Sequence, residues 1–599
     1  MAAAEYRKLI VIVWLITAAA MGAILAPKAW SGANWDADDL MRLVQVRDLL
    51  AGQAWTDLTQ YRMNPPHGTL MHWTRLPDVP VALVTLALSP VLGEHDAIIT
   101  AALVIPPLYF LLFLGFFAFA ARLLLGRADS PIALLVAVGG SFGTRQFVPG
   151  RVDHQGLQLV LMMAAVMLLV YGLARERWGK AIAWAGVPFA LSIWIGAETL
   201  PVIAAWFAAL GLAWCYTGGR LAKHGAGAGL LGAAIGFLIL LTSQPRALWF
   251  SPACDAFSTM PIAMLALIGT GFAGMALLDS QTRSPWTRLL IAVVCGVAAG
   301  GAFAFAFPAC LRGGYEAIDP IVKLRWLDHV VEAMSWIREF GIVPFRAMMD
   351  IWTPALGLGY CIWRIWHAER RGRVLWGVIA VLVLATGALV FWQVRAVSFA
   401  HSVALLPLSA LVAGALRYIW RRPTRWVRYA AAPLLFYVCS LLFWPSIQGA
   451  YAVIATKLPG ALAPKKIITM SCSRSATFVP LQDSPPSLVL SYLDLGAMIL
   501  FRTPHSIVAS HYHRNNEGLR TTIDLFSSSD DAWIKAQMKE RGIAWVVTCP
   551  GPEQTTVFKT EHHDGLAERL AAGQVPGYLE QIADPAVSGM KFYRVRTAE

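Results

Sequence analysis

The stretch "GRVDHQGLQLVL" (residues 150–161) joins two apolar segments and places an acid and a histidine between them. The segments on either side, residues 131–148 and 156–174, have the length and apolar character of membrane spans. Asp153 and His154 therefore stand where the chain leaves one span and enters the next. Because ionisable groups at a membrane boundary are costly and often functional, the stretch indicates a membrane protein with chemistry at one surface of the bilayer.

The composition of the whole chain agrees with a membrane protein. Of its 599 residues, 57% are hydrophobic and 14% are charged, whereas a soluble domain carries about 25% charged residues. The net charge of +13 comes largely from arginine clusters between apolar segments, such as "HAERRGR" (367–373) and "RRPTRWVR" (421–428). Such clusters are typical of cytoplasmic loops, so the basic balance does not indicate a nucleic-acid partner.

Apolar segments of suitable length predict about thirteen membrane helices, with the N-terminus in the cytoplasm so that the arginine clusters lie inside. The first segment also fits a signal peptide, which the many later spans disfavour. The predicted spans are residues 9–26, 97–121, 131–148, 156–174, 181–197, 200–216, 226–243, 261–278, 289–307, 351–366, 374–393, 397–416 and 429–446.

Two domains follow from this topology. Residues 1–450 form a transmembrane domain with long external loops at 27–96 and 308–350, and residues 451–599 form a polar domain on the same external side. The tail alternates strand-like and helical patterns and is expected to be a small α/β domain. An oxidising compartment would allow the disulfides Cys254–Cys310 and Cys472–Cys549, with four free thiols as the alternative.

Unusual acids gather on the external side. Asp38 follows the start of "DADDLMRLVQVRDLL", Asp153 lies between spans, and Glu332 lies in the second long loop. Carboxylates at a membrane boundary need a partner, and a divalent cation such as Mg²⁺ or Mn²⁺, an arginine or a substrate ammonium would serve. Helix capping by the aspartates and a solvated helix face for Glu332 are the alternatives.

Basic groups on the same side suggest an anionic ligand. Arg395 ends an apolar hairpin on the external side, where its guanidinium suits a phosphate, with snorkelling to lipid headgroups as the alternative. His72 and Arg75 in "PPHGTLMHWTRLPD" (65–78) are expected to line the same donor site, and an interfacial anchor built on Trp73 and Arg75 is the alternative. His511 and His513 of the tail predict a metal site or, preferably, a polar loop that packs on the membrane domain or contacts acceptor.

Four local motifs resemble those of GT-C membrane glycosyltransferases, and most closely those of the catalytic subunits of oligosaccharyltransferases. Members of that family have thirteen spans, a long first external loop and an external C-terminal domain. The matching segments are "NWDADDLMRLVQVRDLL" with Asp38, "GRVDHQGLQLVL" with Asp153 and His154, "DHVVEAMSW" with Glu332, and "QVRAVSFAHSVALLPL" with Arg395.

The resemblance implies an enzyme that moves a sugar or oligosaccharide from a polyprenyl-phosphate or polyprenyl-diphosphate donor to an acceptor at the periplasmic face of a bacterial inner membrane. It implies a catalytic set of Asp38, Asp153 and Glu332, and a divalent metal held by Asp38, Asp153 and His154. Arg395, with His72 and Arg75, would bind the donor phosphate.

The sequence also departs from the family. Gln155 replaces the usual acid or histidine, His329 replaces a threonine, and the tail lacks the Trp-Trp-Asp motif that reads the asparagine sequon. The acceptor therefore stays open between glycan, lipid and protein. A transporter or flippase for lipid-linked sugars, and an envelope polysaccharide assembly factor without catalysis, are the competing functions.

Overall fold

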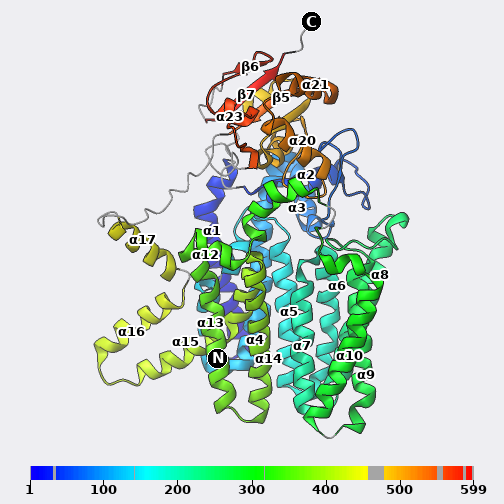
Figure 1. The fold of residues 1–599 in the computed structure, drawn as a ribbon. Helices are drawn as coiled ribbons and strands as arrows, with labels where there is room; N and C mark the ends of the chain where they lie inside the picture. The colour runs from blue at the N-terminus through cyan, green and yellow to red at the C-terminus, as the bar shows by residue number, and fades with distance from the viewer. Residues whose placement is uncertain are drawn as a thin grey trace.

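The computed structural model describes residues 2–31, 35–140, 142–282, 284–315, 318–440, 442–455, 478–549, 557–583 and 589–596. A bundle of long helices occupies one half of the molecule, and a small domain with a β-sheet caps one end of the bundle (Figure 1). The N-terminus lies toward the opposite end, so α1 (Ala3–Trp30) runs up to the capped end.

Within the described residues, nine helices are long and apolar enough to cross a membrane, or ten when the bent pair α16–α17 is one span. The protein is therefore a multi-pass membrane protein. Besides α1 these helices are α4 (Glu94–Gly139), α5 (Gln155–Ala174), α7 (Leu200–Thr217), α8 (Leu221–Ser243), α9 (Thr259–Leu278), α10 (Pro285–Ala306), α14 (Arg370–Trp392) and α15 (Val397–Trp420), and the bent pair is α16 (Arg425–Val438) and α17 (Phe443–Ala455).

The count is lower than thirteen because two predicted spans share one helix, others fold into short or bent helices, and α13 (Pro344–His367), though 24 residues long, is not apolar enough to count. The predicted spans 97–121 and 131–148 share α4, which breaks at Gly126, a glycine with φ of +78°. The span 181–197 is the short helix α6 (Gly186–Ile195), and 351–366 falls within α13 (Pro344–His367). Each predicted span thus falls on a helical segment, although α16 and α17, which hold the last one, project away from the bundle (Figure 1).

The long loop between α1 and α4, which the sequence predicts to be external, folds into a compact layer at the capped end of the bundle (Figure 1). It contains α2 (Ala37–Leu50), the short pair β1 (Thr59–Gln60) and β2 (Thr69–Leu70), and α3 (Asp78–Leu92). The apolar residues of α2 are buried, as their helical spacing predicts. A buried ion pair of 2.8 Å between Arg42 and Asp78 fastens α2 to the start of α3.

The capping domain is an α/β domain, as the tail pattern predicts. Its five-stranded sheet has the order β4-β3-β5-β7-β6, with β3 parallel to β4 and β5 and the other pairs antiparallel. Its elements are β3 (Leu488–Ser491), α19 (Gly496–Arg502), β4 (Ser506–Ile507), α20 (Asn516–Ser527), α21 (Asp531–Arg541), β5 (Ile543–Thr548), α23 (Leu566–Ala571), β6 (Leu579–Ile582) and β7 (Lys591–Val595). The predicted glycine stop after α21 is Gly542, at φ +70°.

Loop contacts hold this domain on the bundle. Ile507 of β4 pairs with Met63 of the first external loop, and the backbone N–H of Asn64 donates to the Ile507 carbonyl at 2.8 Å. The predicted disulfide Cys254–Cys310 is present, with a Cα–Cα distance of 5.2 Å, and it ties the start of α9 to the end of α10. The predicted Cys472–Cys549 pair involves Cys472, which lies outside the described residues.

Candidate active site

A cavity of about 550 Å³ lies where the first loop, the external helix ends and the capping domain meet. Its walls come from segments far apart in the sequence, including the disulfide loop and the loop before α12 (Trp336–Ile342). Five of the predicted site residues line it: Asp38, His72, His154, Glu332 and Arg395.

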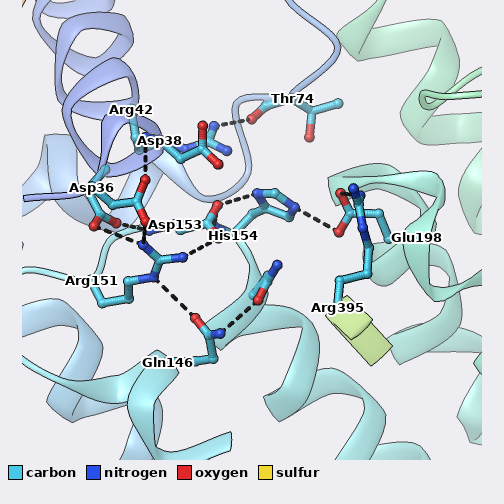
Figure 2. Close-up of polar contacts among 12 residues, drawn as sticks. Asp36, Asp38, Arg42, Thr74, Gln146, Arg151, Asp153, His154, Glu198 and Arg395 are labelled. Carbon is cyan, nitrogen blue, oxygen red and sulfur yellow. Dashed lines mark hydrogen bonds and ion pairs between the residues drawn. The ribbon is translucent and has the colours of Figure 1, made fainter. Parts of the chain in front are cut away.

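Arg151 joins the first and second acidic motifs. The chain turns at Gly150, which has φ of +94°, and this turn follows the 3-10 helix Phe142–Phe147. From there the Arg151 Nη1 atom lies 2.7 Å from Asp36 Oδ2 and 3.3 Å from Asp39 Oδ2 (Figure 2). The backbone N–H of Asp153 donates to Asp39 Oδ1 at 2.9 Å. The two acidic motifs are therefore locked together beside the cavity.

A chain of alternating charges runs from Asp153 to Arg395. The Nδ1 atom of His154 lies 2.5 Å from Asp153 Oδ1, and its Nε2 atom lies 3.0 Å from Glu198 Oε2. The other Glu198 oxygen lies 3.7 Å from Arg395 Nη1, as Figure 2 shows. His154 is thus a bridge between two carboxylates, and Glu198 connects it to the predicted phosphate-binding arginine.

Local folding places the two ends of this chain. Glu198 lies in the tight turn Ala197–Thr199 between α6 and α7, and Pro201 follows within the first turn of α7. Arg395 lies in the turn Val394–Ala396 before α15. The backbone N–H of Val394 donates to the Met334 carbonyl at 3.0 Å, which brings the loop carrying Glu332 against the turn carrying Arg395.

The charges around Asp153 are balanced. Burial opposes ionisation of this carboxyl, but His154 and Arg151 outweigh burial and hold the pKa of Asp153 well below its usual range. Burial likewise disfavours the charged form of His154, yet Asp153 and Glu198 raise the pKa of His154 to about 10. At neutral pH, His154 is therefore an imidazolium ion between two carboxylates.

The charges around Asp38 are not balanced. Removal from bulk water raises the pKa of Asp38 to about 8, and the nearby carboxylates of Asp36, Asp153 and Glu332 add to this effect. Loss of water around the carboxyl at the cavity wall also raises the pKa of Glu332, in spite of Arg151 and Arg395, although the residue as a whole is exposed. The Tyr512 hydroxyl donates to Asp38 Oδ1 at 3.2 Å, which is a neutral partner. At neutral pH, Asp38 therefore holds its proton unless a cation in the cavity compensates its charge.

The capping domain forms one wall of the cavity with residues His511, Tyr512 and His513. His513 Nε2 lies 2.7 Å from Asp255 Oδ2, and Arg514 makes two further bonds to the same carboxylate. His511 pairs with Asp494 of its own domain. These contacts agree with the prediction of a polar loop that packs on the membrane domain.

His72 and Arg75 take different places. His72 lines the cavity beside His513, with ring centroids 4.7 Å apart, and burial next to His513 and Arg514 keeps its pKa well below the usual value. Arg75 is buried in the first loop, where it donates to Gln45, Gln53 and Asp57 and pairs with Asp78. The structure therefore does not bring Arg75 to the cavity.

Arg151 and Glu198 are site residues that the sequence analysis missed. Arg151 lies two residues before Asp153 in the same motif. A cation so close to an acid at the end of a span indicates an ion pair, so the sequence could have identified Arg151. Glu198 is an acid in the short external turn between the predicted spans 181–197 and 200–216. Its partners come from α5 and from the turn before α15, so only the fold identifies it.

The charge and the donor atoms of the site decide whether it suits the predicted divalent metal. The carboxyl oxygens of Asp38, close to Asp153, suit a hard divalent cation, which would displace the Asp38 proton. Both ring nitrogens of His154 face carboxylates, so His154 offers no ligand atom in this arrangement. Among the described residues, no group of three His, Cys, Asp or Glu side chains is arranged to hold a metal. The carboxylates of Asp38 and Asp153 therefore suit a divalent cation in their charge and in their oxygen donor atoms.

Comparison with models of known protein families gives no match, and comparison with curated proteins gives none either. Solved structures do match. The oligosaccharyltransferase AglB of Archaeoglobus fulgidus, in complex with an inhibitory peptide and a dolichol-phosphate, aligns with a TM-score of 0.64 at 12% identity, over 90% of this chain and 69% of AglB.

Two further crystal structures of the A. fulgidus oligosaccharyltransferase align in the same way. The form tethered to an acceptor peptide with the NVT sequon has a TM-score of 0.67 at 13% identity, over 98% of this chain and 74% of that one. The complex with Zn and sulfate has a TM-score of 0.58 at 13% identity, over 90% and 68%. The chain thus has the GT-C fold of oligosaccharyltransferases, as its motifs predict, and at this identity the likeness establishes the fold alone.

Proposed function

We propose that this protein is a glycosyltransferase that moves a sugar or oligosaccharide from a polyprenyl-phosphate or polyprenyl-diphosphate donor to an acceptor at the external face of a bacterial inner membrane. One observation carries the proposal. The active-site cavity, which carries the charged groups on its wall, adjoins an apolar cavity of about 590 Å³ between α7, α9 and α10, and Met264 and Phe303 line both. A ligand with an anionic head and a long apolar tail fits this pair of cavities.

Arg395 is proposed to hold the donor phosphate. Its guanidinium lies at the cavity wall near the end of α15, and its buried Nε atom has no hydrogen-bond partner among the described residues. Arginine binds phosphate through two parallel hydrogen bonds, which a lysine could not reproduce. His72 lines the same cavity, but as a neutral imidazole it would donate a single hydrogen bond.

Asp38 and Glu332 are proposed to orient the acceptor and take its proton. Both line the cavity, and a carboxylate with a raised pKa is a stronger base in its ionised form, a form that a cation beside Asp38 would favour. In the transfer, the acceptor oxygen forms a bond to C1 of the sugar while the bond from C1 to the phosphate oxygen breaks. The acceptor proton passes to the carboxylate, and the phosphate leaves on the lipid.

Asp153 is proposed to act with Asp38 in holding a divalent cation. Such an ion would stabilise the negative charge that develops on the leaving phosphate. The side chains around it keep their positions without the ion, because Arg151 and His154 fix Asp153 and Tyr512 fixes Asp38. A chelator is expected to abolish transfer, and added Mg²⁺ or Mn²⁺ to restore it. Transfer that persists in the chelator would remove the metal from the proposal.

The class of acceptor is a separate question from that of the donor. The A. fulgidus enzyme was crystallised with peptides, but the residues of this chain at the capping-domain wall are His511, Tyr512 and His513, and the sequon-reading motif is absent from the tail. Glycan, lipid and protein hydroxyls all remain acceptors to be tested. The arginine clusters at the end of the bundle away from the capping domain support a cytoplasmic N-terminus and a periplasmic cavity.

Donor binding gives a direct test that needs no knowledge of the sugar. Purified protein in detergent is titrated with undecaprenyl phosphate, and bound lipid is counted by native mass spectrometry. Arg395→Gln is expected to bind about tenfold more weakly than wild type, while the matched change Arg246→Gln, in an external turn outside the cavity, is expected to bind normally. Equal binding by the Arg395 variant would reject the phosphate role.

A transport assay separates the enzyme from the competing transporter. Liposomes that hold the protein and a lipid-linked sugar but no acceptor should show no flux that depends on Asp38 or Glu332. Flux that is lost in Asp38→Asn would instead favour the transporter.

A further inference from the structure

An ion-pair cluster joins the loop before α9 to the capping domain. Both oxygens of the Asp255 carboxylate are bound there: Arg514 donates from Nη2 to Oδ1 at 2.8 Å and from Nε to Oδ2 at 2.9 Å. The Nε2 atom of His513 lies 2.7 Å from the same Oδ2 atom. Because an arginine that binds a carboxylate through two hydrogen bonds is fixed in orientation as well as in distance, this cluster sets how residues 513 and 514 lie against the membrane domain.

The cluster is shielded from solvent. The side chains of Asp255, His513 and Arg514 are 16, 14 and 21% exposed. Burial opposes ionisation of Asp255, but the hydrogen bonds from His513 and Arg514 outweigh burial and hold the pKa of Asp255 well below its usual range. The carboxylate is therefore charged at neutral pH, and its ion pair is screened less by salt than a pair on the open surface.

The membrane domain holds Asp255 in a restrained loop. Asp255 follows Cys254, whose disulfide to Cys310 ties the start of α9 to the end of α10. The Ser258 hydroxyl, at the N-terminus of α9, bonds both backbone groups of the residue two positions before Asp255. The chain after Cys310 also packs closely, since a Cβ atom at Gly314 would lie 3.3 Å from the Asp255 Cβ atom. The carboxylate is thus presented to the capping domain from a fixed position.

On the capping-domain side, the residue before His513 reaches the proposed catalytic carboxyl. The Tyr512 hydroxyl lies 3.2 Å from Asp38 Oδ1 and 3.3 Å from the carbonyl oxygen of Ala37. Burial, with the nearby Asp38 carboxylate, raises the pKa of Tyr512 well above its usual value, so the phenol keeps its proton and donates it. Any shift of the residue that Asp255 holds would move this hydroxyl as well.

The other contacts of this wall are contacts between rings. Tyr512 lies edge-on to Trp73, with ring centroids 5.2 Å apart, and His513 lies against the rings of His72 and Tyr315. Ring pairs tolerate a range of distances and angles, whereas a carboxylate bound by an arginine has one preferred arrangement. The ion pair with Asp255 is therefore the contact that sets the position of the wall.

We propose that Asp255 is a positioning residue of the active site, which holds His513 and Arg514 so that Tyr512 stays in contact with Asp38. Tyr512 in turn fixes the orientation of the Asp38 carboxyl and leaves its other oxygen for the cation or the acceptor. Asp255 takes no part in the chemistry itself, because the capping domain binds both of its oxygens. The inference rests on the proposed transfer reaction, in which Asp38 acts.

The first test compares Asp255→Asn with wild type in the purified full-length protein. Transfer is measured with lipid-linked sugars extracted from a deletion strain as donor and membranes of that strain as acceptor. The rate at saturating donor should fall at least about tenfold, because a small misplacement of a group at the reacting atoms is costly. Binding of undecaprenyl phosphate, counted by native mass spectrometry, should stay at the wild-type level. General loss of folded protein would lower both.

The matched control is Asp319→Asn. Asp319 makes a comparable ion pair with a capping-domain arginine, Arg520, at 3.1 Å, but it does not line the cavity. Its loss should leave the transfer rate near the wild-type value. A fall as large as that of Asp255→Asn would show that any loosening of the capping domain has this effect, and would contradict a specific role for Asp255.

Two further variants test the route through Tyr512. Arg514 does not line the cavity, so Arg514→Gln can lower the transfer rate only through the ion pair and its loop, and it serves also if Asp255→Asn fails to accumulate. Tyr512→Phe should lower the rate as well. The double variant of Asp255→Asn and Tyr512→Phe should be no slower than the slower single variant, because the two residues act in series.

Hydrogen exchange gives a measurement that does not depend on transfer. Asp255→Asn should raise the exchange of the backbone amides of residues 511–514 and leave that of β5 unchanged. If wild type transfers no sugar, the proposed function fails, while this result still reports on the loop. Wild-type transfer rates in both Asp255→Asn and Arg514→Gln, unchanged exchange at 511–514, or multiplied losses in the double variant would each overturn the inference.

Discussion

Asp38 and Asp153 are both acids at the start of a helix beside one cavity, yet their surroundings are opposite. Asp153 lies against the cations Arg151 and His154, and its pKa is held low. Asp38 has a neutral partner in Tyr512 and three carboxylates nearby, and its pKa is raised to about 8. The comparison separates two roles: Asp153 is held ionised in a rigid frame of ion pairs, whereas Asp38 keeps its proton until a cation or a cationic group of the substrate lies beside it.

The largest expected effect is on activity at Asp38. Asp38→Asn should lower the transfer rate by at least about a hundredfold, because it removes the carboxyl group that is proposed to hold the cation and to take the acceptor proton. Its Tm should stay the same or rise, since the change relieves repulsion among the neighbouring carboxylates. The measurement is transfer rate together with Tm of the purified protein. A stability loss as large as the activity loss would place Asp38 in the frame with Asp153.

A change at Arg151 tests the frame of ion pairs around Asp153. Arg151→Gln should destabilise the protein by about 3 kcal/mol, because it leaves the buried Asp39 without a cation and removes one of the two cations beside Asp153. Thermal unfolding measures this loss, and Arg338→Gln, which removes an exposed bond to the Asp328 carbonyl, is the matched control. If both variants unfold at the wild-type temperature, the frame is not held by Arg151.

Glu198 lies between the two regions and should give an intermediate effect. Glu198→Gln removes the charge that faces both His154 and Arg395. We expect kcat to fall about tenfold and the KM for donor to fall as well, because the phosphate no longer competes with Glu198 for Arg395. Steady-state kinetics with the donor varied would separate the two constants. Unchanged kcat and KM would leave Glu198 with no part in the site.

The smallest expected effect is a pH dependence at the capping domain. Burial disfavours the charged form of His511, but Asp494 raises its pKa above the usual 6.5, to about 8. A raised histidine pKa stabilises the folded state fully below pH 6.5, and the contribution is lost as the pH rises through about 8. His511→Gln should therefore lower Tm at pH 6.5 and leave it unchanged well above pH 8. A Tm difference that does not vary with pH would contradict this.

The parts of the fold that depend on local pattern could be predicted from the sequence. Apolar length predicted the helical bundle, alternating patterns predicted the capping α/β domain, and the sidedness of Cys254 and Cys310 predicted their disulfide. Motif resemblance led to Asp38, Glu332 and Arg395, which do share one cavity.

The parts that depend on partners from distant segments could not be predicted. The sequence places His154 beside Asp153 but does not show that Glu198 lies on its other nitrogen. Likewise His72 and Arg75 are three residues apart, yet one faces the cavity and the other is enclosed by its own loop. The charges that surround a buried side chain depend on which distant segments pack against it. The different surroundings of Asp38 and Asp153 therefore could not be predicted from the sequence.

The central claim is that the protein transfers a sugar from a lipid-linked donor at this cavity. The most direct test measures the lipid-linked sugars and the surface glycans of cells. Lipid-linked sugars and surface glycans would be compared in a deletion strain complemented with wild type, with Asp38→Asn or with no gene. The account predicts that one lipid-linked sugar accumulates and one glycan disappears in both the deletion and the Asp38→Asn strain, with the variant protein present at normal levels. Normal glycans in the Asp38→Asn strain would contradict it.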